Sequence, residues 1–234
     1  MTEQHTVVLH DEWIDARKAL LAKEKEFTRL RDQLSRERRE LPWERVEKEY
    51  VFNGPDGEPS LTDLFDGRSQ LVVYHFMFDP DARWDEACKH CSFWADNFDP
   101  IIVHLNARDV TMVAVSRAEL EEITRYRERM GWSFKWLSSH GSDFNFDYAV
   151  SFGADELEAP VFNYGTLRPG FGDREGVSVF VRDGNEVFHA YSTYGRGIDM
   201  LNTAYHYLDI VPNGRGEEGG PPQQWVRRHD EYGT

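Results

Sequence analysis

The most constraining feature of the sequence is the pair Cys88 and Cys91, the only two cysteines of the chain. The pair follows residues 71–78, a largely apolar run, several of whose side chains are β-branched or aromatic, which is typical of a buried central strand. From the pair onward, apolar residues recur with the spacing of a helix that has one buried face. These residues are Cys91, Trp94, Ala95, Phe98, Ile102 and Leu105. A strand, a loop and a C-x-x-C pair at the start of a helix predict a redox-active site.

The two cysteines are expected to have different roles. A thiol at a helix N-terminus faces unpaired backbone N–H groups and the positive end of the helix dipole, so Cys88 is the expected thiolate and nucleophile. Cys91 lies one turn further on, on the apolar face, and is the expected resolving thiol that attacks a mixed disulfide at Cys88. Between them, Lys89 and His90 add a positive charge and a titratable ring. We expect both to lower the pKa of Cys88 and to make the disulfide more oxidising.

Two other interpretations of the pair stay open. The thiolates could be ligands of a soft metal such as copper or zinc, together with His75 or His90. No second C-x-x-C and no H-x3-H pattern completes a zinc ligand set, so we predict neither a metal nor another cofactor. A pair without redox chemistry would make the protein a non-catalytic interaction module.

Length and charge exclude several classes of partner. With 234 residues, the chain is long enough for one domain with a sizeable core and extensions. Its net charge of -15 argues against binding to nucleic acid or to anionic membranes. No run approaches the roughly 20 apolar residues of a membrane span, and residues 1–5 lack a secretory pattern. We therefore expect a cytoplasmic protein, in which a disulfide is transient rather than structural.

The chain is expected to divide into three segments. Residues 1–45 form a helical extension, with a charged helix at 11–40 that begins at Asp11 as N-cap and ends before Pro42. Residues 46–211 form the main domain, and residues 212–234 form a Gly/Pro-rich tail. Apolar residues recur at seven-residue intervals along the helix, at Trp13, Leu20, Phe27, Leu34 and Leu41. This narrow stripe either packs on the domain of the same chain or forms a homodimer contact.

The main domain alternates strands and helices. The expected strands are 50–52, 71–78, 110–115, 134–137, 177–181 and 186–191. The expected helical segments are a capped turn at 60–67, a helix from Cys88 that is interrupted near Pro100, a helix from a Ser116–Glu119 capping box to Gly131, and shorter helices at 146–152 and 199–208. Residues 158–176 form a loop, and Trp225 is expected to dock the tail. This order predicts an α/β fold around a central mixed sheet.

The element order resembles the thioredoxin fold, and residues 57–78 with the insertion at 132–152 resemble its peroxiredoxin branch. Residues 74–78, 88–96 and 191–197 are similar to a bacterial thioredoxin-like family of unknown function, and the likeness continues into the tail at 225–230. The resemblance implies a thioredoxin-like three-layer α/β fold with a central mixed sheet, an N-terminal helical extension and a C-terminal tail. It implies no substrate.

The sequence also departs from the resembled families. Thioredoxins place a cis-proline just before the strand that faces the cysteine pair, whereas this chain has Glu175 and Gly176 there. Peroxiredoxins require a Pro-x3-Thr-x2-Cys pattern, whereas here Asp85 stands three residues before Cys88 and residues 82–87 contain no proline. The resemblance therefore implies neither docking of ordinary thioredoxin partners nor a standard peroxidase site.

In the resembled topology, two loops must reach the sheet edge that carries Cys88. These loops are residues 160–176 and 194–197, and their candidate binding residues are Phe162, Tyr164, Arg168, Phe171, Tyr194 and Arg196. We expect the aromatic residues either to clamp an apolar substrate or to pack on the sheet. We expect Arg196 or Arg168 to hold a carboxylate or to stabilise the thiolate.

His75 lies in the central strand, at a position where the resemblance implies a buried carboxylate used in proton transfer. It is expected either to be a hydrogen-bonded core residue or to relay the proton that leaves Cys91. The function that the sequence favours is a thiol-disulfide oxidoreductase acting on a protein or small-molecule disulfide.

Overall fold

The computed structural model describes residues 5–233 of the chain. Residues 1–4, which belong to the segment without a secretory pattern, and Thr234 lie outside the described residues. The chain forms two compact units, Met1–Pro42 and Trp43–Thr234. Within residues 5–233, no helix is both long enough and apolar enough to cross a membrane.

The first unit contains the long helix α1 (His10–Arg39). Asp11 is not its N-cap, as the sequence had predicted, because Leu9 holds that position and its backbone N–H donates to the Glu12 carboxylate at 3.2 Å. Asp11 lies in the first turn instead, where a negative charge is still favourable. Within His10–Arg39 no residue is buried. Both expectations for the apolar stripe, packing on the domain and a homodimer contact, stay predictions.

The second unit is built on a mixed sheet, which has six strands within residues 43–233. The strands are β1 (Glu44–Arg45), β2 (Gln70–His75), β3 (Val110–Ser116), β4 (Trp136–Ser138), β5 (Gly176–Asp183) and β6 (Glu186–Tyr194). Their order in the sheet is β1-β6-β5-β2-β3-β4. Strands β2, β3 and β4 run parallel, β5 runs antiparallel to β2, and β6 runs antiparallel to β5. The apolar run therefore supplies an interior strand, as predicted.

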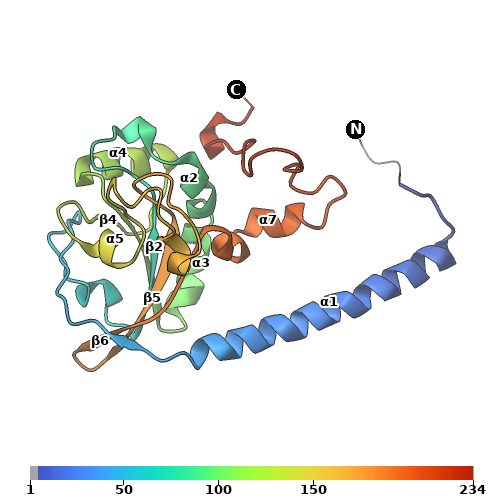
Figure 1. Cartoon of the computed structure of the whole chain (residues 1–234), viewed down its shortest axis with the longest axis horizontal. Helices are drawn as coiled ribbons and strands as arrows, with labels where there is room; N and C mark the ends of the chain where they lie inside the picture. Colours follow the sequence, from blue (N-terminus) through green and yellow to red (C-terminus); the bar gives the residue numbers. More distant parts are fainter. Residues whose placement is uncertain (1–4, 234) are drawn as a thin grey trace. The chain divides into compact units, whose positions relative to one another are not determined.

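Helices cover both faces of this sheet. They are α2 (Lys89–Ala95), α3 (Phe98–Asn106), α4 (Leu120–Met130), α5 (Phe144–Asp147), α6 (Phe162–Gly165) and α7 (Thr203–Leu208). Figure 1 shows α2 and α3 on one side of the sheet and α5 on the other. Side chains from α2, α3 and α4 share a core with Tyr74, whereas α5 packs with Val73 on the opposite face. These three layers and this strand order make the fold thioredoxin-like, so the predicted fold class is confirmed.

Side-chain alternation along β2 decides which residues can meet the cysteine pair. Tyr74 and Phe76 belong to the core that contains Cys91, whereas Val73 belongs to the opposite core. Successive side chains of a strand point to opposite faces, so His75 faces the α5 side. Its ring lies 5.6 Å from that of Phe144, in agreement with this alternation.

Two predicted elements are absent or begin elsewhere. In the described residues 50–52 there is no regular strand, because Val51 forms only an isolated bridge with Ser60. The Ser116 capping box is also wrong: Ser116 ends β3, and its Oγ donates to the Phe76 carbonyl at 2.7 Å. Because that hydroxyl is used in the core, α4 begins only after Glu119.

Other boundaries shift by a few residues. The helix that starts at the cysteine pair ends at Ala95, and a new helix starts at Phe98, so Pro100 lies in a first turn that needs no N–H from it. The helix predicted at 146–152 lies earlier, as α5, and the one predicted at 199–208 is a 3-10 segment (Gly195–Leu201) followed by α7. The predicted hairpin is confirmed as β5 and β6.

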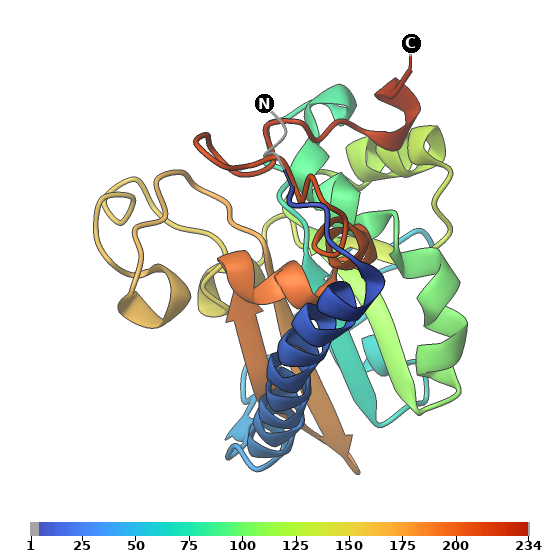
Figure 2. The same ribbon diagram turned by 90° about the vertical axis from the view of Figure 1, so that its right-hand side faces the viewer.

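The C-terminal tail packs on the domain, as predicted from Trp225. The Trp225 ring lies 5.3 Å from that of Phe93 in α2, and its Nε1 donates to the Glu217 carboxylate at 2.9 Å. Further along, Asp230 forms an ion pair with Arg129 of α4 at 2.7 Å. Figure 2 shows the end of the tail, in red, beside the helices of this face.

Candidate active site

The cysteine pair lies at the start of α2, where the sequence predicted it. Cys88 is the N-cap residue, and Cys91 lies in the first turn. Both are free thiols, and Cys91 is buried whereas Cys88 is half-buried. The backbone N–H of Cys91 donates to the Cys88 Sγ at 3.3 Å, and that of Met77 donates to the Cys91 Sγ at 3.4 Å. The more accessible position of Cys88 is therefore confirmed.

The fold shifts the pKa values of the two thiols in opposite directions. A hydrogen bond with the Cys91 side chain holds the pKa of Cys88 well below its ordinary value, with help from His90 and against the effect of burial. Burial raises the pKa of Cys91 well above its ordinary value, and the hydrogen bond and charge of Cys88 raise it further. These shifts favour the thiolate form of Cys88 and the protonated form of Cys91.

The pair opens into a cavity of about 900 Å³ that Cys88, His90 and Cys91 help to line. Its other walls come from Tyr74, Met77 and Trp94 and from the segments 162–175 and 195–223. The aromatic lining residues are Tyr74, Trp94, Phe162, Phe171 and Tyr205. The charged lining residues are Arg174, Glu175, Arg196, Asp199, Asp209, Arg215, Glu217 and Glu218. The volume falls in the range of small-molecule sites, roughly 300 to 1,000 Å³.

Of the predicted binding residues, Phe162, Phe171 and Arg196 line this cavity. Arg196 is largely exposed, and its Nε lies 3.2 Å from the Asp199 carboxylate. The loop after β6 thus reaches the cavity of the pair through Arg196, as expected, and a binding role for Arg196 stays a prediction. The placement expected for Tyr194 is wrong: it does not line the cavity, is buried, and donates from its hydroxyl to the Tyr148 carbonyl at 3.0 Å.

Tyr164 and Arg168 also lie outside the cavity lining, contrary to expectation. The Tyr164 hydroxyl donates to the Ser192 carbonyl at 2.9 Å, which ties it to β6. Arg168 is exposed and lies 3.5 Å from the Glu158 carboxylate. The loop was placed correctly, but these two side chains satisfy their polar groups elsewhere.

His75 does not face the cysteine pair. Its Nε2 lies 2.8 Å from the Ser178 Oγ in a hydrogen bond, and its ring packs near Phe144 and Tyr148 on the far face of the sheet. Burial lowers its pKa to about 3, so it stays neutral. The placement contradicts the relay expected between His75 and Cys91, and it agrees with the alternative of a hydrogen-bonded core residue.

Tyr74 is a site residue that the sequence analysis missed. It is fully buried and lines the cavity, and its hydroxyl has no well-formed hydrogen bond to any described residue. Burial raises its pKa, and the nearby Cys91 thiol raises it further. Strand alternation could have identified Tyr74. Neighbouring side chains of a strand point to opposite faces of the sheet, so Tyr74 and His75 cannot both face the cysteine pair.

Arg174 and Glu175 were missed as well. They directly precede β5 and line the cavity. Burial raises the pKa of Glu175. The following Gly176 is needed for close packing, because a Cβ there would lie 2.7 Å from the Tyr194 ring. The sequence position of Arg174 and Glu175 could have indicated them, because they come just before the strand that faces the cysteines.

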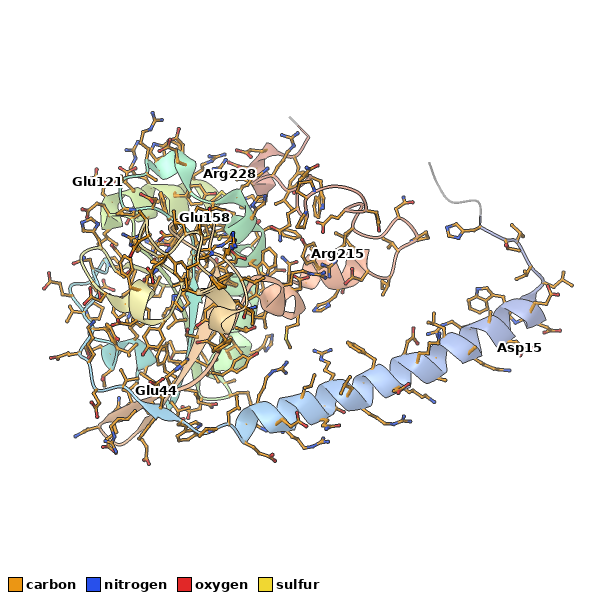
Figure 3. The ribbon with its side chains drawn as sticks, viewed as in Figure 1. Asp15, Glu44, Glu121, Glu158, Arg215 and Arg228 are labelled. Carbon is orange, nitrogen blue, oxygen red and sulfur yellow. The ribbon has the colours of Figure 1, made fainter. Side chains whose placement is uncertain are left out.

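Arg228 fixes the loop that leads to the nucleophile. This side chain comes from the tail and lies at the α2 end of the domain (Figure 3). Its Nη2 donates to the carbonyls of Asp85 at 2.9 Å and Ala87 at 2.8 Å, and its Nε donates to the Tyr126 hydroxyl at 2.9 Å. Two backbone carbonyls within the three residues before Cys88 are thereby held by a residue far away in sequence.

The alternative of a copper or zinc site at the cysteine pair requires further ligands close to the two thiols. Among residues 5–233, no group of three or more His, Cys, Asp or Glu side chains is arranged to hold a metal ion. His75, one of the ligands considered, lies on the other face of the sheet, and His90 is the ligand candidate beside Cys88.

The sequence matches the family described as "Bacterial protein of unknown function (DUF899)" over residues 2–232. The chain belongs to this family. The family resemblance inferred from the stretches around the cysteine pair is therefore confirmed. The description of the family states no activity, so the function has to be argued from the site. A comparison with curated proteins found no match.

Among solved structures, the chain is similar to peroxidoxin BcpB from Mycobacterium tuberculosis, with 13% identity and a TM-score of 0.43 over 66% of this chain and 89% of that one. It is also similar to peroxiredoxin Q from Xanthomonas campestris, with 13% identity and a TM-score of 0.42 over 69% of this chain and 90% of that one. A protein described as a candidate thiol:disulfide interchange protein DsbE from Chlorobium tepidum shows 14% identity and a TM-score of 0.42 over 74% and 99%. At these values the likeness says nothing about activity.

Proposed function

We propose that this protein is a thiol-disulfide oxidoreductase in which Cys88 is the nucleophile and Cys91 the resolving thiol. The opposite acidity of two free thiols on one cavity supports this most directly. A thiolate attacks disulfides, and a second thiol one helical turn away can release the product. A structural pair gives no reason for one thiol to be ionised and open to a cavity.

In the reductive direction, the Cys88 thiolate attacks one sulfur of a substrate disulfide. A bond forms between that sulfur and the Cys88 Sγ, the substrate S–S bond breaks, and the other sulfur leaves as a thiolate. Cys91 then attacks the Cys88 Sγ and gives its proton to the leaving group. The products are a Cys88–Cys91 disulfide and two substrate sulfurs in the thiol or thiolate form. Two electrons pass from the pair to the substrate.

A thiol reductant must then return the pair to its reduced form, by the same exchange in reverse. A pool of small thiols or a dithiol protein would serve. We also propose a cytoplasmic location, as the sequence predicted, because thiols are kept reduced there.

A single-turnover experiment tests the proposal with the neutral probe bis(2-hydroxyethyl) disulfide. Reduced wild-type protein is mixed with excess probe, and mass spectrometry follows loss of two hydrogens as the Cys88–Cys91 disulfide forms. Cys91→Ser is expected to stop at a mixed disulfide on Cys88, and Cys88→Ser is expected not to react. If Cys88→Ser reacted as fast as the wild type, or if the wild type reacted no faster than a free thiol at equal total thiol concentration and pH 7, the proposal would be refuted.

A further inference from the structure

Arg174 lies over two aromatic rings in the wall of the cavity that contains Cys88. Its guanidinium carbon is 4.2 Å from the centroid of the Phe171 ring and 5.3 Å from that of Phe162. All three residues line the cavity. Such cation–π contacts hold the guanidinium in place before a ligand arrives, so less side-chain freedom is lost on binding.

The guanidinium of Arg174 has no carboxylate partner in the part of the chain that the structure describes, and its buried Nε has no hydrogen-bond acceptor there. Two other arginines of the cavity differ in this respect. Arg196 lies 3.2 Å from Asp199, and Arg215 lies 2.9 Å from the same carboxylate. A buried donor without a partner is unfavourable, and an oxygen ligand would satisfy it.

Most carboxylates of the cavity already have partners. Asp199 is paired with two arginines, and Asp209 lies 2.6 Å from the Arg215 guanidinium. Glu217 accepts hydrogen bonds from Trp225 at 2.9 Å and Tyr205 at 3.2 Å. Burial raises the pKa of Glu175, against the opposing effect of the Arg174 charge, and no ion pair joins the two side chains in the described residues. Glu218 lies exposed in the tail. Arg174 is therefore the cationic side chain of the cavity that is placed to attract an anionic ligand.

We infer that Arg174 forms a carboxylate-binding subsite of this cavity, and that the substrate of the cysteine pair is a low-molecular-weight disulfide that carries a carboxylate. The identity of the reacting group, a disulfide, rests on the proposed function. A guanidinium fits a carboxylate with two parallel N–H donors. The volume of about 900 Å³ suits a small molecule. The rings of Phe162 and Phe171 give its carbon skeleton an apolar surface.

The subsite would act by positioning. A carboxylate held at Arg174 keeps the disulfide of the same molecule in the cavity that the Cys88 thiolate faces, so attack becomes effectively intramolecular. The exchange itself is unchanged: the substrate S–S bond breaks, the Cys88–substrate bond forms, and the pair supplies both electrons.

Turnover with two disulfides of similar length tests the inference. The anionic probe is 3,3′-dithiodipropionate, the neutral probe is bis(2-hydroxyethyl) disulfide, and each rate is divided by that of a free thiol. We expect the wild type to prefer the anionic probe in kcat/KM, and Arg174→Gln to lower the anionic-to-neutral ratio roughly tenfold or more. Arg174→Lys, which keeps the charge but loses the paired donors, is expected to lie between the two.

The matched control is Arg182→Gln. Arg182 lies near the far end of β5 and donates to the Gly184 carbonyl at 2.8 Å, so this variant removes the same charge outside the cavity. Its anionic-to-neutral ratio is expected to equal that of the wild type. Because the result is a ratio, a general loss of folding in Arg174→Gln would lower both rates and leave the ratio unaffected.

A second measurement needs no turnover. Cys88 is alkylated with the anionic reagent N-(2-carboxyethyl)maleimide and with the neutral reagent N-ethylmaleimide. The ratio of the two alkylation rates reports the preference for an anionic group in a single chemical step. Turnover without charge preference would overturn the subsite and leave the oxidoreductase function standing. Charge-selective alkylation without turnover would overturn the oxidoreductase function and leave the subsite standing. A charge preference that persists in Arg174→Gln would overturn the assignment to Arg174.

Discussion

Acidification from pH 7 to pH 5 is expected to destabilise the domain by about 2 kcal/mol through His75. Burial lowers the pKa of His75 from 6.5 to about 3. As the pH falls below 6.5, the unfolded chain takes up a proton that the folded chain does not, so the free energy of unfolding decreases until the pH reaches the folded pKa. Each pH unit in this window removes about 1.4 kcal/mol, and pH 5 lies about 1.5 units into it.

The assay is urea unfolding of the wild type and His75→Gln at pH 7, 6 and 5. Glutamine keeps a polar group near Ser178 but has no ionisable proton in this range. We expect the wild type to lose about 2 kcal/mol more than His75→Gln between pH 7 and pH 5. His104→Gln is the matched control, because His104 is exposed on α3 and its replacement is expected to keep the wild-type slope.

Equal slopes for the wild type and His75→Gln would refute the reasoning, and so would an NMR titration of His75 with a midpoint near its unfolded value. The outcome also bears on the active site, because Tyr74 and His75 project from opposite faces of β2. If His75 titrated like an exposed histidine, the α5 face of β2 would be open to water. The packing of His75 against Phe144 and Tyr148, which fixes Tyr74 on the Cys91 side, would then be wrong.

Three further predictions concern the surroundings of the pair. Iodoacetamide at pH 7 is expected to modify Cys88 well before Cys91, and mass spectrometry that found the reverse order would exchange their roles. His90→Gln is expected to raise the pKa of Cys88 and to lower the reduction potential by tens of millivolts, since about 30 mV corresponds to 1.4 kcal/mol. An unchanged potential in glutathione buffer would remove His90 from the mechanism. Arg228→Gln is expected to lower the free energy of unfolding by roughly 1 to 3 kcal/mol, because two partly buried carbonyls lose their donor. The exposed neighbour Arg227 provides the control substitution, and equal stability of the two variants would exclude this role.

The sequence predicts best where the signal is local. The periodic apolar residues after Cys91 locate α2, and the apolar run before Cys88 locates β2, because each pattern reports burial of one short segment. The hairpin of β5 and β6 carries its own turn at Gly184. Ser116 shows the limit of local patterns: its hydroxyl could cap a helix, but the fold uses it to bond the Phe76 carbonyl.

Side chains that meet across long sequence separations were harder to predict. Topology placed residues 160–176 at the pair, but it could not say that Arg168 would pair with Glu158 while Arg174 stayed in the cavity. That choice depends on the path of the chain through α6, where Asn163 and Tyr164 have positive φ angles of 50° and 59°. No short sequence pattern predicts such a backbone path.

The acidity of Cys88 is a property of the folded chain, and this couples the redox chemistry to stability. In the unfolded chain, neither Cys91 nor His90 is held beside the Cys88 sulfur, so its pKa returns to the ordinary value. A pKa lowered by folding means that the thiolate stabilises the folded, reduced protein at any pH above the folded pKa. Formation of the disulfide removes that charge, and the same free energy makes the pair more oxidising. His90→Gln must therefore lower the reduction potential and the stability of the reduced protein together, and it must leave the stability of the oxidised protein nearly unchanged.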